Sequence, residues 1–148
     1  MPHISFTIGE QAFLIPVPMV RGVIERRNVR PLPGTHPFVD GVIVREGLVL
    51  PVYDLRRIPD LFPTPPPDRP PEAMILLYAW EDFLNGWVVD RADVLPGEPE
   101  EDPDPSPPGI GAEFIAARHT RDGRKYLTLR MDSLHNVLEV GAQTGERS

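Results

Sequence analysis

The feature that most constrains the fold is a pair of apolar runs that meet at a short polar turn, within residues 38–57. The runs Val42–Val44 and Leu48–Tyr53 are rich in β-branched and aliphatic side chains, and the tripeptide 45–47 separates them. Runs of this composition joined by a glycine-containing turn are typical of a β-hairpin, because Gly47 can adopt the positive φ of a tight turn. The stretch has no nucleophile, metal cluster or phosphate loop, so it indicates a structural and docking element.

Similar strand pairs recur along the chain at roughly ten-residue spacing. Further strands are expected at residues 4–8, 12–17, 73–80, 84–90, 114–118 and 125–129. Val20, Val23 and Ile24 lie at helical spacing and predict a short helical turn or an irregular segment. Residues 131–138 also have helical spacing and predict a short helix, with Asp132 as its cap. Many short strands with little helix predict an all-β fold, built as a small barrel or a pair of barrels.

Two proline-rich segments interrupt this pattern. Residues 59–71 contain seven prolines, and residues 96–108 contain six prolines and five acids. Proline has no N–H to donate, so the first segment is expected to be an extended excursion rather than helix or central strand. One strand cluster precedes it and another follows it, which predicts a loose two-fold organisation within a single domain at 1–140. Residues 141–148 are expected to form a disordered tail.

Composition excludes several classes of function. The chain has 148 residues, a net charge of −7 and no cysteine, so disulfides and thiolate chemistry are excluded. A net negative charge argues against nucleic acid as the main partner. Residues 1–57 are the exception, with seven arginines against five acids. The sequence has neither a signal-peptide pattern nor an apolar run long enough to span a membrane, so we expect a cytoplasmic protein without direct membrane insertion.

No arrangement of side chains predicts catalysis. The four histidines are not at metal-ligand spacing, and each is expected at the surface or in a turn: His3, His36, His119 and His135. Asp54 and Asp90 each end an apolar strand and are expected to cap the following turn. We therefore expect a protein that is not an enzyme, with no catalytic residue, no metal site and no cofactor.

Blocks of sequence in a fixed order carry a family resemblance. They are Val20–Ile24, Leu32–Gly34, Gly41–Arg56, Gly86–Leu95 and Lys125–Leu138. In these blocks the chain resembles the CheW-like domain, the adaptor fold of bacterial chemosensory arrays, from about Phe6 to about Val140. The most diagnostic is Gly41–Arg56, which is similar to the family's Gly-Val-Ile-Asn-Leu-Arg-Gly-x-Val-Val-Pro-Val-Ile-Asp-Leu-Arg.

The resemblance implies two small five-stranded SH3-like β-barrels with short helices, one of them near the C-terminus. It also implies a non-enzymatic adaptor in chemosensory signal transduction. Proteins of this family bridge a CheA-type histidine kinase and the cytoplasmic tips of chemoreceptors. They bind the regulatory domain of the kinase through barrel-to-barrel contacts and dock receptor helices in a groove between the barrels.

The resemblance further implies a partner-binding surface. Its candidate residues are Val20, Gly22, Val23, Gly41, Val44, Arg45, Glu46 and Gly47. The family's Asn and Arg before the turn glycine fall on Val44 and Glu46, and a family acid falls on Gly22. A cation replaced by an anion removes any matched ion pair and adds repulsion, which predicts weak binding to a standard receptor tip and an altered partner specificity.

Two alternatives differ in class. The chain could be a general β-barrel module that binds a small ligand or single-stranded nucleic acid through Tyr78, Trp80 and Trp87, which requires a basic groove around these rings. It could also be a degenerate CheW-like protein that assembles a different signalling complex. The proline-rich segments either stiffen their loops or serve as ligands for proline-reading domains.

Overall fold

The computed structural model describes residues 2–104 and 109–146. Within them the backbone forms short strands, single 3₁₀ turns and one longer helix, as predicted for the all-β class. The strands are β1 (His3–Ile8), β2 (Gln11–Pro16), β3 (Val20–Glu25), β4 (Val39–Arg45), β5 (Leu48–Tyr53), β6 (Met74–Trp80), β7 (Phe83–Val89), β8 (Arg91–Leu95), β9 (Glu100–Glu101), β10 (Ile115–Arg121) and β11 (Arg124–Leu129). The 3₁₀ turns are η1 (Val17–Met19), η2 (Arg26–Asn28), η3 (Leu55–Arg57) and η4 (Ala112–Phe114), and the helix is α1 (Met131–Glu146).

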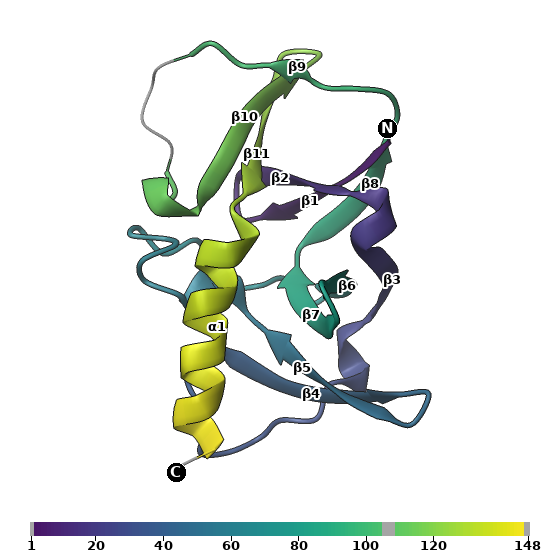
Figure 1. Ribbon diagram of the computed structural model, residues 1–148, viewed down its shortest axis with the longest axis vertical. Coiled ribbons are helices and arrows are strands. Elements are labelled where there is room, and N and C mark those ends of the chain that lie inside the picture. The colour runs from purple at the N-terminus through teal and green to yellow at the C-terminus, as the bar shows by residue number, and fades with distance from the viewer. Residues whose placement is uncertain (1, 105–108, 147–148) are drawn as a thin grey trace.

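The strands form two sheets, one above the other in Figure 1. One has six strands in the order β8-β1-β2-β11-β10-β9, and the other has five in the order β3-β6-β7-β5-β4. The first exceeds the predicted five strands because the two-residue β9 adds to the edge of β10. Each sheet takes strands from both sides of residues 59–71, so the predicted grouping by sequence halves is wrong. A hairpin alone is marginally stable, and β1–β2 gains its neighbours from β8 and β11, much later in the chain.

The hairpins themselves are confirmed. Glu46 and Gly47 join β4 to β5 with φ values of 51° and 78°. Asp122 and Gly123 join β10 to β11 in the same way, with φ values of 50° and 78°. Two successive positive φ values are typical of the tight turn whose twist matches that of paired strands.

The helical or irregular conformation predicted for Val20–Ile24 is wrong. These residues lie in β3, which pairs antiparallel with β6, and its side chains alternate between half-buried and exposed positions. The apparent helical spacing arises because Gly22 occupies an inward position without a side chain, while the apolar Val23 occupies an outward one. The register shift between Val20 and Gly22, where Gly22 has a φ of 150°, marks a β-bulge in the pairing with β6.

The five-stranded sheet closes into a barrel through Arg30. Its backbone N–H donates to the Val42 carbonyl at 2.8 Å and its carbonyl accepts from the Val42 N–H at 2.9 Å. Gly41 permits this approach, because a Cβ at that position would lie 2.2 Å from the Arg30 oxygen. The barrel is filled by its own apolar cluster, which consists of Ile43, Leu50, Val52, Ala73, Ile75, Leu77 and Val88.

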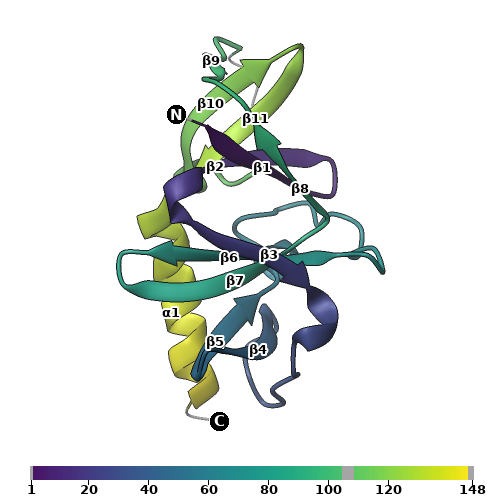
Figure 2. The same ribbon diagram turned by 90° about the vertical axis from the view of Figure 1, so that its right-hand side faces the viewer.

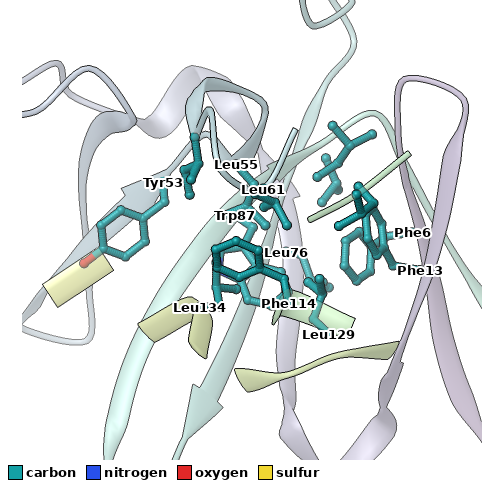
Figure 3. Packing of buried hydrophobic residues seen from close by; sticks show 14 of the residues in the cluster. Phe6, Phe13, Tyr53, Leu55, Leu61, Leu76, Trp87, Phe114, Leu129 and Leu134 are labelled. Atoms are coloured by element: carbon teal, nitrogen blue, oxygen red, sulfur yellow. The ribbon is translucent and has the colours of Figure 1, made fainter. Parts of the chain in front are cut away.

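The main core lies between the two sheets and α1. Figure 3 shows Phe6 and Phe13 of the six-stranded sheet on one side of this cluster and Tyr53 on the other. Trp87 and Leu134 lie between them, so both sheets and the helix share one core. The ring of Phe6 stacks on that of Phe13 at 5.1 Å between centroids.

The helix differs from its prediction in two respects. It extends to Glu146, so a disordered tail at 141–148 is wrong for 141–146, while 147–148 lie outside the described residues. A helix anchored in the core at its first turns can add one hydrogen bond for each further residue. His135 is buried rather than at the surface: its Nε2 lies 2.8 Å from the Tyr78 hydroxyl and its ring stacks on Trp80 at 4.6 Å.

The proline-rich segments are less separate from the domain than expected. Residues 59–71 contain no strand or helix, as predicted, but they bury Leu61 and Phe62 in the main core. The second segment, 96–108, contributes β9 to the six-stranded sheet, and its residues 105–108 lie outside the described part. No helix in the described ranges is long and apolar enough to cross a membrane.

Candidate partner-binding surface

The candidate surface is centred on the end of the β4–β5 hairpin, residues 44–49, which we call the hairpin tip. Figure 1 shows the tip extending beyond the body of the five-stranded barrel, on the side where β3 lies. All six of its residues are exposed. Ile43 and Leu50, directly behind it, are buried in the barrel and pair across the strands, so the tip has a rigid base.

The tip carries apolar side chains in solvent. Val44 and Val49 are directly opposite each other and are 61% and 64% exposed. Leu48 pairs with Arg45 on the other face of the hairpin and is 55% exposed. Large apolar side chains gathered on one exposed element are typical of an interaction surface, because isolated proteins usually bury such area.

The charge of the tip is mixed. Arg45 and Glu46 are adjacent and exposed, and within the described residues neither forms an ion pair. Glu46 lies in the turn itself, with a positive φ, and is exposed. The end of the hairpin therefore presents a carboxylate to a partner, with the Arg45 guanidinium one residue earlier.

The candidates on β3 lie at one edge of the five-stranded sheet, and β4 of the hairpin lies at the other edge. The contact between Arg30 and Val42 closes the barrel and brings these two edges together. Val23 is 39% exposed and can contribute to a surface. Val20 is half-buried and packs against the main core. A Cβ at Gly22 would meet only Leu77, at 3.9 Å, yet its φ of 150° disfavours any side chain there.

The eight candidates thus divide by environment. Gly41 is buried and serves barrel closure, so it is part of the scaffold under the surface. The other candidates on the hairpin, 44–47, form the exposed tip. Sequence reasoning missed Leu48 and Val49, because a continuous apolar run indicates a buried strand. Their position next to the turn was the available signal, because strand residues that extend past the end of a small barrel no longer face its interior.

A network of half-buried arginines around two buried aspartates holds the base of the hairpin. Arg26 of η2 donates to both oxygens of Asp40 in β4, at 3.1 and 2.8 Å. Arg69, from the first proline-rich segment, bridges Asp40 at 2.8 Å and Asp54 at 2.9 Å. These contacts fix η2 and residues 59–71 against β4, on which the tip is built.

Arg56 extends this network to the other sheet. Its Nη2 donates to Asp90 at 2.5 Å, and the second oxygen of Asp90 accepts the Gly9 N–H in the β1–β2 turn at 2.8 Å. Asp54 accepts the Arg56 N–H at 3.3 Å, so it caps the following turn as predicted. Asp90 instead binds a turn from the N-terminal hairpin. Burial raises the pKa of Asp54 and outweighs the opposing effect of the neighbouring arginines.

The aromatic rings considered for nucleic-acid stacking belong to the interior. Trp87 and Tyr78 are almost fully buried, with ring centroids 4.1 Å apart, and burial raises the pKa of Tyr78. Trp80 stacks on His135. A base cannot reach the buried rings of Trp87 and Tyr78, and His135 covers one face of the half-buried Trp80, so the three rings do not form an open stacking platform. Among the described residues, no group of three or more His, Asp or Glu is placed to hold a metal ion.

Comparisons with known proteins agree with this architecture. The model of the CheW-like domain matches residues 2–139. The chemotaxis protein CheW of Bacillus subtilis (strain 168) is 30% identical over 107 residues, which cover 72% of this chain and 67% of that protein. The chemotaxis protein CheW of Thermotoga maritima is 33% identical over 88 residues, 60% of this chain but only 56% of that protein.

A solved structure supports the fold. The scaffolding protein TtCheW from Thermoanaerobacter tengcongensis superposes with a TM-score of 0.74 at 20% identity, over 87% of this chain and 88% of that one. The family model covers nearly the whole sequence. The chain belongs to the CheW-like domain family, whose members are non-enzymatic scaffold proteins.

Proposed function

We propose that this chain is a cytoplasmic adaptor that couples a CheA-type histidine kinase to chemoreceptors, with a receptor specificity that differs from the family's usual one. Family membership supports the adaptor role. The observation that carries the specificity is the hairpin tip, where exposed valines surround a turn with a carboxylate at its first position.

The two faces of the tip suit different partners. Val44 and Val49 form an apolar face that can pack against another barrel, as expected for the kinase regulatory domain. Glu46 lies at the extremity, where the resemblance implies a receptor-facing arginine. An unmatched like charge across an interface slows association and lowers affinity. A standard receptor tip is therefore a poor ligand, and a receptor with a cation opposite Glu46 is the proposed partner.

The kinase contact is tested by titrating the full chain with a CheA-type regulatory domain. Saturable binding is expected, and Val49→Asp should weaken it roughly tenfold or more, because a carboxylate in the apolar face loses its hydration on docking. Val94→Asp is the matched control. Val94 is 65% exposed on β8, in the other sheet, so the same substitution there should leave the affinity unchanged.

If the wild type and the Val49→Asp variant bind the regulatory domain with equal affinity, the hairpin tip does not contact the kinase as proposed. A wild-type chain that binds neither the regulatory domain nor any receptor tip, yet co-purifies with other signalling proteins, would favour the degenerate family member that assembles a different complex.

A further inference from the structure

In the part of the chain that the structure describes, one face of the six-stranded sheet buries few apolar side chains. Its inner face contributes Phe6, Ile8, Phe13, Ile15, Leu127 and Leu129 to the main core. Its opposite face has a cluster of only three buried residues, Ala12, Leu14 and Tyr126, with Leu95 at its margin. The corresponding face of the five-stranded sheet buries seven apolar residues. On this face the six-stranded sheet therefore does not enclose a large apolar interior.

Strand register places polar side chains on this face. In the β1–β8 pair, Ser5 is opposite Asp93 and Thr7 is opposite Arg91. These residues surround a pocket of about 110 Å³, which Arg124 and Tyr126 of β11 complete. Ser5 and Thr7 are half-buried, whereas the charged side chains of Arg91, Asp93 and Arg124 are exposed to solvent. A hollow lined by these side chains is open to a polar ligand.

The pocket has an excess of positive charge. Arg91 and Arg124 provide two guanidinium groups and Asp93 one carboxylate, and none of the three forms an ion pair with another described residue. The Arg124 guanidinium lies over the Tyr126 ring, 5.7 Å from its centroid, which orients it. The side chains of Arg91 and Arg124 are both exposed, so their charges are available to a ligand.

The chemistry of the pocket selects one class of ligand. Guanidinium groups bind carboxylates in a bidentate geometry, and the hydroxyls of Ser5 and Thr7 lie in the same wall. The volume corresponds to about four water molecules at roughly 30 Å³ each, which fits a ligand of a few heavy atoms. Asp93 repels a dianionic phosphate more strongly than a carboxylate group of unit charge.

From this geometry we propose that the pocket between β1, β8 and β11 binds a small monocarboxylate, of the size of acetate or propionate. Arg91 and Arg124 hold the carboxylate and Asp93 disfavours more highly charged anions. β1, β8 and β11 lie at the end of the molecule opposite to β4 and β5 (Figure 2), so this site is separate from the proposed partner surface.

The test is a titration of the isotope-labelled full chain with propionate at constant ionic strength, followed by amide chemical shifts. Saturable shifts are expected at residues of β1, β8 and β11. Replacing both arginines by glutamine (Arg91→Gln with Arg124→Gln) should weaken binding by roughly tenfold or more. Arg21→Gln, on an exposed arginine of the other sheet, is the matched control and should bind as the wild type does.

A second titration with inorganic phosphate tests the selectivity. Above its second pKa phosphate is a dianion, whereas propionate is a monoanion, so phosphate is expected to bind roughly tenfold more weakly than propionate, and Asp93→Asn should narrow that difference. The proposal is overturned if propionate gives no saturable shifts, if the double arginine variant binds propionate as well as the control does, or if phosphate binds as tightly as propionate. Amide spectra of the unliganded variants establish that each is folded.

Discussion

The Arg56→Met variant tests whether the buried ion network holds the two sheets together. The Arg56 side chain is 3% exposed and lies between Asp90, at 2.5 Å, and Asp54, at 4.0 Å. Removing one partner of a buried pair leaves an uncompensated charge and costs about 3–5 kcal/mol. Domains of this size unfold with about 5–15 kcal/mol, so the variant should lose a large part of the stability.

The assay is equilibrium unfolding in urea. With a slope of about 2 kcal/mol/M, a loss of about 4 kcal/mol lowers the midpoint by about 2 M. Arg57→Met is the matched control, because Arg57 lies in the same 3₁₀ turn and 3.7 Å from the same Asp54 carboxylate, but its side chain is 45% exposed. Asp54 is buried but keeps Arg69 as a partner at 2.9 Å, so losing the half-exposed Arg57 should cost at most about 1 kcal/mol.

A double variant separates the loss of an ion pair from the burial of a lone charge. Two nitrogens of Arg56, Nε and Nη1, are buried without a hydrogen-bond partner, so the pair itself adds little net stability. Asp90→Asn removes the facing charge and keeps an oxygen for the Gly9 N–H. Combining it with Arg56→Met should recover much of the lost stability. The reasoning is refuted if Arg56→Met costs no more than Arg57→Met.

Two further predictions concern barrel closure and pH. Gly41→Ala should cost about 2–4 kcal/mol in urea unfolding, because its Cβ displaces the Arg30 carbonyl and both closing hydrogen bonds. Gly47→Ala, with φ of 78° and open space around it, should cost only about 1–2 kcal/mol, and equal losses would contradict the closure role. Burial lowers the pKa of His135 from 6.5 to about 4. The unfolded chain then binds the extra proton first, so stability falls as the pH drops from about 6.5 to about 4, by up to about 3 kcal/mol. His135→Gln should unfold without this part of the pH dependence, and an unchanged pH profile would refute it.

Local structure was predictable from the sequence where the determining residues are neighbours. The turns at 46–47 and 122–123 follow from a glycine between apolar runs, and the structure confirms both. The helix start near Met131 follows from local spacing in the same way. These features depend on the backbone conformation of a few neighbouring residues, and the local amino-acid sequence determines that conformation.

Features that depend on distant partners were not predictable. The segment of β3 looked helical because the exposed Val23 lies at helical spacing from Val20 and Ile24, and only the pairing with β6 makes this segment a strand. The burial of His135 depends on how α1 docks against Tyr78 and Trp80. The order of strands in each sheet likewise comes from pairings between distant segments, which no local pattern encodes.

The candidate surface was predictable in position but not in composition. Family resemblance led to the turn around Glu46, and the structure places that turn at an exposed tip. Gly41 was assigned to the same surface, but its close approach to Arg30 shows that a glycine is needed there for barrel closure. The exposure of Leu48 and Val49 became visible only once the end of the barrel was known.

The central claim is that the charge of the turn at Glu46 sets receptor specificity, and an affinity measurement tests it. A standard chemoreceptor tip fragment is titrated with the wild type, with Glu46→Arg and with Glu81→Arg. Glu81 is an exposed acid at another turn with nearly the same backbone, φ of 54° against 51°, so it controls for net charge and strain. We predict weak binding by the wild type, binding roughly tenfold tighter by Glu46→Arg, and no change for Glu81→Arg. Ordinary micromolar binding by the wild type, or equal effects of the two substitutions, would contradict the claim.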